Sequence, residues 1–267
     1  MDNETLRALQ LKKLDSLHEI ERICEKHNLR FFLDYGTLLG AIRHGGYIPW
    51  DDDIDLSMPI SDFNKFIKIA KTELDDRFFL QTADTDPPYS LPFMKIRTNN
   101  TTDLFIPWKK YKIHQGLCLD IFQIYPLARN KILRSIQYKA AMVYKLSYKS
   151  RIFESKKIRA VQKVMHLLPR KFWAFITIPF FAKYSDEKAV TYSHLIEEPK
   201  APILASDLFP LKKMRFEDKE YPVPANYHVY MTATYGDYMT PPPEAERIGH
   251  DGFIVDLDKS YEEYLDK

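Results

Sequence analysis

Cysteine is scarce in this chain, where only Cys24 and Cys118 occur among 267 residues. Two cysteines cannot staple a fold of this size, so we expect free thiols in a reducing, cytosolic compartment. Long apolar runs are missing too, and no stretch approaches the roughly 18 residues that a membrane-spanning helix needs. The polar, acidic residues Met1 to Thr5 lack the basic and apolar regions of a secretory signal. The sequence therefore predicts no disulfide framework, no spanning helix and no signal peptide.

The overall composition is ordinary for a globular protein, with 45% hydrophobic and 28% charged residues, which excludes wholesale disorder. The net charge of +2 conceals an asymmetry. Residues 131–183 hold thirteen Lys or Arg and the single acid Glu154, whereas the rest of the chain holds 26 basic and 36 acidic residues. This asymmetry predicts that one segment faces an anionic surface.

Glycine is also rare, and its distribution is uneven. Half of the eight glycines lie within eleven residues: Gly36, Gly40, Gly45 and Gly46. Four aspartates follow within five positions: Asp51, Asp52, Asp53 and Asp55. Glycine permits close approach of the backbone to a ligand, and clustered carboxylates repel one another unless a cation compensates them. The two features side by side suggest a phosphate-and-metal site.

Apolar periodicity predicts an α/β (α+β) fold in which helices flank a mixed β-sheet. Helices are expected over residues 4–27, 37–44 and 61–74, with Ser61 as the N-cap of the third. Strands are expected over residues 30–35, 53–58, 91–97 and 117–124. From residue 131 to about 184 the pattern turns helical and basic.

The strand expected at 53–58 would place Asp53 and Asp55 on one face, because side chains alternate along a strand. Two carboxylates held side by side can bind Mg²⁺ through oxygen ligands, although a solvated turn of acids fits the spacing as well. Asp120, within an apolar strand, is costly unless it is paired or bound to a metal. Gly36 and Thr37, where a strand gives way to a helix, could offer backbone N–H groups and a hydroxyl to an anion. Three acids and such a turn suit metal-assisted phosphoryl transfer.

Three segments together resemble the signature of the LicD-type cholinephosphotransferase family and, in part, its fukutin-like relatives. They are Tyr35-Gly-Thr-Leu-Leu-Gly40, Ala41-Ile-Arg-His44 and Ile48-Pro-Trp-Asp-Asp-Asp-Ile-Asp55. Further matches are Lys95-Ile-Arg97, the strand from Gly116 to Phe122, and Tyr235-Gly-Asp-Tyr-Met239 with its following prolines. Gln123-Ile124 departs from the family, which often places a proline after the residue corresponding to Phe122. The resemblance implies a nucleotidyltransferase-like fold and transfer of phosphocholine from CDP-choline to a sugar hydroxyl of a cell-envelope glycan precursor, of teichoic acid or lipopolysaccharide type, with release of CMP.

The same resemblance assigns roles to the candidate residues. Asp53 and Asp55 match the metal-binding pair and Asp120 the third carboxylate, so we expect them to be catalytic and to hold Mg²⁺ or Mn²⁺, with two ions in all. Gly36 and Thr37 match the phosphate turn.

Several further residues have two interpretations. Arg43 and Lys95 could contact the donor phosphates, since a polyanionic transition state needs positive charge, or be a surface cation and a partly buried strand lysine. Asp51 is either a supporting acid or a loop residue. We expect His44 and His114 to be structural, and Tyr235 and Asp237 to close the pocket rim. Trp50, Trp108 and Tyr111 could offer aromatic faces to the choline ammonium, although most aromatics serve the core.

The predicted organisation is a catalytic core over residues 1–130, a basic amphipathic helical insertion over 131–185, and a segment completing core and pocket over 186–267. Basic and aromatic residues alternate in the insertion, which suits an anionic bilayer and also nucleic acid. The site chemistry favours the membrane, because a lipid-linked glycan acceptor would be met there. We therefore expect peripheral attachment to the inner face of the cell membrane and no nucleic-acid partner. The alternatives are transfer of ribitol- or glycerol-phosphate from its CDP donor, or a non-catalytic nucleotide-binding module.

Overall fold

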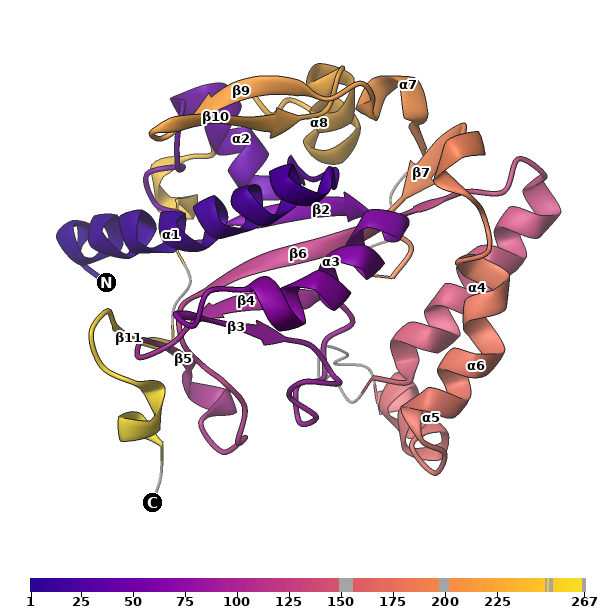
Figure 1. Ribbon diagram of the computed structural model, residues 1–267, viewed down its shortest axis with the longest axis horizontal. Coiled ribbons are helices and arrows are strands. Elements are labelled where there is room, and N and C mark those ends of the chain that lie inside the picture. The colour runs from indigo at the N-terminus through magenta and orange to yellow at the C-terminus, as the bar shows by residue number, and fades with distance from the viewer. Residues whose placement is uncertain (149–155, 197–201, 248, 250–251, 266–267) are drawn as a thin grey trace.

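The structure is a computed structural model that describes the chain except for residues 149–155, 197–201, 248, 250–251 and 266–267 (Figure 1). The α-helices are α1 Asn3–His27, α2 Tyr35–His44, α3 Ile60–Glu73, α4 Lys131–Leu146, α5 Lys156–Met165, α6 Arg170–Phe181, α7 Ala205–Leu208 and α8 Tyr227–Tyr235. The strands are β1 Phe32–Leu33, β2 Asp55–Pro59, β3 Phe78–Gln81, β4 Met94–Thr98, β5 Thr102–Phe105, β6 Cys118–Pro126, β7 Thr191–Ser193, β8 Ile203–Leu204, β9 Lys212–Phe216, β10 Lys219–Val223 and β11 Phe253–Asp256.

The central sheet is mixed, as predicted. Its strands follow the order β1-β2-β6-β4-β3, with β7 paired to β6 and β8 to β7. Only the β2–β6 pair within this sheet is parallel, with Asp55 opposite Asp120, while β4 runs antiparallel to β6 with Lys95 opposite Asp120. Residues opposite each other share a face of the sheet. The register therefore gathers Asp55, Asp120 and Lys95 on one face.

Helices α1 and α3 lie across the other face of this sheet (Figure 1). Helix α1 begins at the N-cap Asp2, whose carboxylate accepts a hydrogen bond from the Thr5 N–H at 2.8 Å, and ends at Asn28 in the left-handed region with φ 51°. Its buried stripe includes Leu9, Leu17 and Ile20, which join the main core. Burial of this apolar stripe, rather than helix propensity, provides most of the stability of such a helix.

Two local boundaries differ from the predicted ones. Strand β2 begins at Asp55 rather than at Asp53, since residues 51–54 form a turn and loop in which the Asp51 N–H donates to the Ile48 carbonyl at 2.9 Å. Helix α2 begins two residues early, at Tyr35, because the Asp34 carboxylate accepts from the Tyr35 N–H at 2.7 Å and caps the helix.

Ser61 is not the N-cap of α3, because that helix begins at Ile60 after the N-cap Pro59, and the Ser61 N–H donates to the Asp186 carboxylate at 3.3 Å. The strand expected at 91–97 is β4 at Met94–Thr98, and the one expected at 117–124 is the longer β6, which ends at Pro126. A proline can end a strand because it lacks the N–H that the ladder needs.

The basic helical insertion, residues 131–185, forms the helices α4, α5 and α6 in its described residues, as predicted, and these lie together at one end of the sheet (Figure 1). A small second core joins it to β6, with Tyr125 and Leu127 packed against Ala141 and Phe181. Among the described residues no helix combines the length and apolar character needed to cross a bilayer.

The C-terminal residues add elements that the sequence did not predict. The antiparallel hairpin β9–β10 and helix α8 pack beside α2 and β1 (Figure 1), and β11 pairs with β5 as a separate two-stranded ribbon. Phe216, Tyr221 and Tyr230 from these elements are buried in the main core. The division of the chain into three segments stays a prediction.

Candidate active site

Asp55 lies at the centre of an acidic cluster. Burial, followed by the charges of Asp53, Asp120, Asp51 and Asp34, raises the pKa of Asp55 well above its usual value. Like charges around a partly buried carboxyl disfavour its ionised form. A site with this electrostatic imbalance is suited to a cation, which would remove the imbalance.

The position of Asp55 is fixed by its backbone. Its N–H donates to the Thr37 hydroxyl at 2.8 Å, and its carbonyl accepts from the Asp34 N–H at 3.0 Å. Thr37, buried near the start of α2, therefore ties that helix to the first residue of β2. The Thr37 hydroxyl, which we expected from the sequence to contact a phosphate, thus accepts a structural hydrogen bond from Asp55.

The acidic loop, Asp51 to Asp53, brings three carboxylates together before β2. One oxygen of each lies within 4.8 Å of the others. The Asp53 side chain is 44% exposed and lies outside the strand in which the sequence placed it, so strand alternation does not pair it with Asp55. The pair meets through the loop instead, since Asp53 contributes to the raised pKa of Asp55.

Lys13 of α1 anchors the acidic loop through its buried side chain. Its ammonium is buried, donates to the Asp52 carbonyl at 2.8 Å, and lies 3.5 Å from Asp53 Oδ1 and 3.3 Å from Asp103 Oδ2. Burial alone would lower the pKa of Lys13, but the charges of Asp103 and Asp53 raise it well above its usual value. Sequence reasoning missed this residue, although a lysine one turn from the apolar residues Leu9 and Leu17 was a detectable signal.

Asp120 is paired with Lys95. The Lys95 ammonium donates to both carboxylate oxygens at 2.6 and 2.7 Å, and the side chains are 12% and 19% exposed. Burial opposes the charged form of Lys95, but the Asp120 charge outweighs it and raises the pKa of Lys95. The structure thus joins two predicted site residues to each other, with the ammonium at the edge of the acidic cluster.

Gly36 lies against the acidic loop. A Cβ added there would stand 2.6 Å from Asp51 Oδ2, too close for any side chain. The glycine therefore allows the Asp51 carboxylate to approach the first turn of α2, where N–H groups and the helix dipole favour negative charge. Asp51 is accordingly part of the cluster rather than a distant loop residue.

A buried polar network surrounds Asp34, the N-cap residue of α2. Asp34 accepts from the Ser57 hydroxyl at 2.5 Å and the Tyr230 hydroxyl at 2.5 Å, and His194 Nε2 lies 2.9 Å from Asp34 Oδ2. Burial raises the pKa of Asp34, but His194 and the hydroxyl donors outweigh it and lower that pKa. The network was invisible in the sequence because Asp34 lies 160 residues from His194 and 196 from Tyr230.

Among the described residues, Arg43 donates no hydrogen bond to Asp51, Asp53, Asp55 or Asp120. Its guanidinium donates to the Tyr238 carbonyl at 3.1 Å, and burial, with the nearby Arg247 charge, lowers its pKa. Arg247 stacks 5.2 Å above the ring of Trp50, one residue before the acidic loop. His44 also contacts Trp50, with ring centroids 6.4 Å apart. This places two guanidinium groups beside the approach to Asp51.

His114, as predicted, has a structural environment. Its ring stacks on Phe79 with centroids 5.0 Å apart and lies 2.9 Å from the Asn99 side-chain oxygen. Burial lowers its pKa to about 3, so it is neutral at physiological pH. Tyr235 is exposed, and Asp237 accepts from the Thr240 hydroxyl at 2.8 Å, so each lies at the surface.

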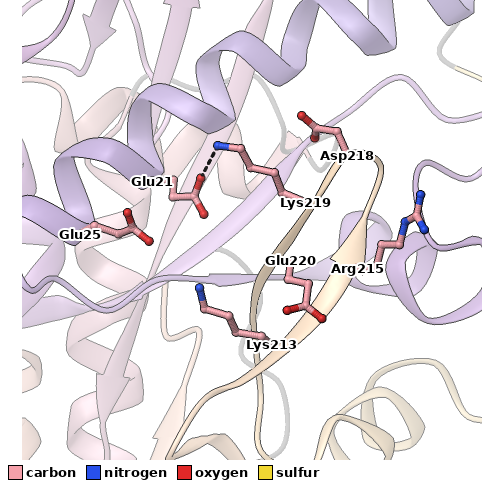
Figure 2. Close-up of a pocket in the computed structure, with 7 residues that line it drawn as sticks. All are labelled: Glu21, Glu25, Lys213, Arg215, Asp218, Lys219 and Glu220. Atoms are coloured by element: carbon pink, nitrogen blue, oxygen red, sulfur yellow. Dashed lines mark hydrogen bonds and ion pairs between the residues drawn. The ribbon is translucent and has the colours of Figure 1, made fainter.

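A separate surface pocket of about 630 Å³ lies between α1 and the β9–β10 hairpin (Figure 2). Its described lining is wholly charged, and Lys219 pairs across it with Glu21 at 3.1 Å. None of the predicted site residues lines it. Opposite charges that neutralise one another at an exposed surface provide little binding energy, so this pocket is not the reaction site.

The donor set of the acidic cluster fits a hard divalent cation. Asp51, Asp53, Asp55 and Asp120 offer carboxylate oxygens, the ligands that Mg²⁺ and Mn²⁺ prefer. Burial, and then the neighbouring carboxylates, raise the pKa of Asp55, and a bound cation would favour its ionised form. The number of ions and their ligands stay predictions.

Comparisons with known proteins show what this sequence is similar to. Residues 28–148 match a family model described as LicD/FKTN/FKRP, nucleotidyltransferase domain. Over 257 residues, 94% of this chain and 97% of the relative, the sequence is 27% identical to the lipopolysaccharide cholinephosphotransferase LicD of Haemophilus influenzae. Over 79 residues, 28% of this chain and 15% of the relative, it is 34% identical to the ribitol 5-phosphate transferase FKRP of Mus musculus and of Homo sapiens. The resemblance stated from the sequence motifs is confirmed.

Proposed function

From the match of residues 28–148 to the LicD/FKTN/FKRP family model and the similarity to LicD over most of the chain, we propose that this protein transfers phosphocholine from CDP-choline to a sugar hydroxyl of a cell-envelope glycan precursor. The reaction releases CMP. The relative similar over nearly the whole chain is named for the transfer of phosphocholine to lipopolysaccharide, which supports an acceptor of this type over a teichoic acid.

The observation that carries the proposal is the pairing of Asp55 with Asp120 on parallel strands, next to the acidic loop and the start of α2. In the reaction, the acceptor oxygen forms a bond to the choline-bearing phosphorus, the bond from that phosphorus to the CMP oxygen breaks, and CMP keeps the electron pair. A Mg²⁺ or Mn²⁺ pair bound by Asp53, Asp55 and Asp120 would supply charge neutralisation and a lower pKa for the attacking hydroxyl.

The chain's own groups position the phosphates. Lys95 brings a buried positive charge to within 2.6 Å of Asp120, where negative charge accumulates on the transferred phosphoryl group. The N–H groups of the first turn of α2 face the same cluster and favour an anion. We assign contact with the second phosphate of the donor to Arg247, over the ring of Trp50, and to Arg43 near it.

The test is CMP release from CDP-choline, measured with Mg²⁺ and with excess EDTA. Asp53→Asn, Asp55→Asn and Asp120→Asn should each lower kcat by about 10²-fold or more, in line with the loss of a group that stabilises transition-state charge. Asp218→Asn, at the exposed pocket of Figure 2, is the matched control and should retain normal turnover. Full activity in EDTA, or near-normal activity of Asp53→Asn, would contradict the mechanism.

A second candidate donor is CDP-ribitol, because the FKRP relatives are named as ribitol 5-phosphate transferases. Isothermal titration should give metal-dependent binding of CDP-choline well above that of CDP-ribitol or CDP-glycerol. A preference for CDP-ribitol would identify the protein as a polyol-phosphate transferase. A non-catalytic module would bind nucleotide without releasing CMP.

We also propose that the basic helical insertion attaches the protein to an anionic bilayer. The insertion exposes apolar side chains to solvent: Phe175 of α6 and Leu167 of the α5–α6 turn are each 81% exposed, and Ile132 of α4 is 73% exposed. Exposed lysines such as Lys163 and Lys171 lie among them. Apolar side chains that enter the interface, with cations that face anionic headgroups, are typical of a peripheral helix.

Liposome flotation tests the attachment. Wild-type protein should float with phosphatidylglycerol vesicles, and added salt should weaken this binding by screening. The double variant Lys163→Glu with Lys171→Glu should lose binding, whereas Lys212→Glu with Lys213→Glu, on exposed β9, should retain it. Equal binding to neutral vesicles would reject the electrostatic part, and no binding to either would reject the attachment.

A further inference from the structure

A cavity of about 940 Å³ lies between the catalytic core and the basic helical insertion. The core contributes the loops at 83–91 and 105–113, and the insertion contributes Tyr148 and the α5–α6 connection. Aromatic rings dominate the walls: Tyr89, Phe105, Trp108, Tyr111 and Tyr148. The volume is at the upper end of the range of about 300–1,000 Å³ that is usual for ligand pockets.

Two polar groups in this lining lack a hydrogen-bond partner among the described residues. The Tyr89 hydroxyl belongs to a side chain that is only 2% exposed, and the His166 Nε2 atom is buried and unpartnered although the residue itself is half-buried. A buried polar group left unpaired is costly and rare in folded proteins. Both groups would be satisfied by a ligand that carries hydroxyl groups.

The charge of the lining distinguishes between ligand classes. Its described residues include the cations Lys110 and Arg170 but neither aspartate nor glutamate. Arg170 is held by Asp84 at 2.6 Å and lies 5.2 Å above the Tyr148 ring. The described lining itself offers no carboxylate to a quaternary ammonium, whereas Lys110 and the Asp84-paired Arg170 offer donors that suit a phosphate group. Aromatic faces beside them offer apolar contact to the C–H face of a sugar ring.

A series of ring contacts links the cavity wall to the Lys95–Asp120 pair. The ring of Tyr89 meets that of Phe93 edge-on at 6.5 Å, and the Lys95 ammonium lies 5.4 Å above Phe93 while it pairs with Asp120. The outer wall belongs to the insertion, where we place the membrane.

We propose that this cavity binds the acceptor, as one or more sugar rings with an adjoining phosphate. The assignment rests on the proposed function, which requires a glycan to reach Asp120. It also gives Trp108 and Tyr111 a role in holding the acceptor instead of the choline.

Saturation-transfer NMR tests the proposal with lactose, N,N′-diacetylchitobiose and galactose 1-phosphate as probes and with phosphocholine as the competing class. The sugar protons should receive saturation from the wild-type protein, and galactose 1-phosphate should bind more tightly than galactose. Trp108→Ala should weaken binding about 10-fold or more, as the loss of an aromatic anchor does. Tyr89→Phe keeps the ring and should weaken it roughly 2- to 10-fold, the effect of one hydrogen bond. Tyr235→Ala, an exposed tyrosine outside the cavity, is the control and should bind normally.

Three results would overturn the proposal. They are sugar binding that is unchanged in Trp108→Ala, phosphocholine binding that is lost in Trp108→Ala, and the absence of binding by all three sugar probes. CMP release from CDP-choline, measured without an acceptor, tests the proposed function separately from this binding experiment. A wild-type protein that releases no CMP from CDP-choline would refute the transferase while the binding result stands.

Discussion

Replacing Lys95 by methionine should destabilise the protein strongly, because it leaves Asp120 as an uncompensated buried carboxylate. The side chains are 12% and 19% exposed and share two hydrogen bonds of 2.6 and 2.7 Å. The loss of one partner of a buried pair costs about 3–5 kcal/mol. At roughly 2–4 °C per kcal/mol for a large domain, the midpoint of thermal unfolding should fall by about 6–20 °C.

The double variant Lys95→Met with Asp120→Leu provides the decisive comparison. Replacement of both partners by apolar groups of similar size is often close to neutral, so the double variant should be more stable than Lys95→Met alone. Urea unfolding of the wild type, both single variants and the double variant gives the coupling energy. If the destabilisation of the double variant equals the sum for the two single variants, Lys95 does not stabilise the protein by pairing with Asp120.

Magnesium adds a functional readout to the same variants. A cation at the acidic cluster would replace the charge that Lys95→Met removes, so saturating Mg²⁺ should restore part of the lost stability. Binding at 100 times the dissociation constant contributes about 2.7 kcal/mol, and Asp55→Asn in the same background should abolish this gain. A Lys95→Met protein that Mg²⁺ does not stabilise would contradict a cation site that includes Asp120.

Three further substitutions test the supporting structure. Gly36→Ala should lower kcat and weaken Mg²⁺ binding without unfolding the protein, because its Cβ would displace the Asp51 carboxylate that stands 2.6 Å away; unchanged Mg²⁺ affinity by titration would contradict this. His114→Gln should make the free energy of unfolding less sensitive to acid. The pKa of His114 is about 3 in the folded protein and about 6.5 in the unfolded chain, so the residue takes up a proton on unfolding below about pH 6.5. The free energy of unfolding of the wild type therefore falls from about pH 6.5 towards pH 3, and the loss is about 2 kcal/mol at pH 5. Urea midpoints at pH 7.5 and 5.0 measure the difference, and equal pH sensitivity in the variant would refute it. Tyr230→Phe removes one hydroxyl from Asp34 and should cost about 1 kcal/mol in urea unfolding, with a lower kcat if the network positions α2; unchanged kcat would limit the network to stability.

The catalytic segment could be read from the sequence because its signals are local. A glycine-rich turn, an acidic tract and strands of alternating pattern occur within about a hundred residues, and each reflects steric or electrostatic rules that act between near neighbours. The predicted acids Asp53, Asp55 and Asp120 do contribute to one cluster. The predicted start of the second strand at Asp53 was wrong, because Lys13, forty residues away, holds the backbone of the acidic loop outside the strand.

The sequence by itself determined the α/β class, the acidic tract beside the glycine turn and the basic helical insertion, because periodicity, charge and glycine placement are properties of short segments. Only the tertiary structure decided that Lys95 pairs with Asp120, that Asp34 meets His194 and Tyr230, and that the rings of the core and the insertion enclose one cavity. These contacts join residues that are 25 to 196 positions apart. Their formation depends on how sheet register and helix packing close the chain on itself, which no local pattern encodes.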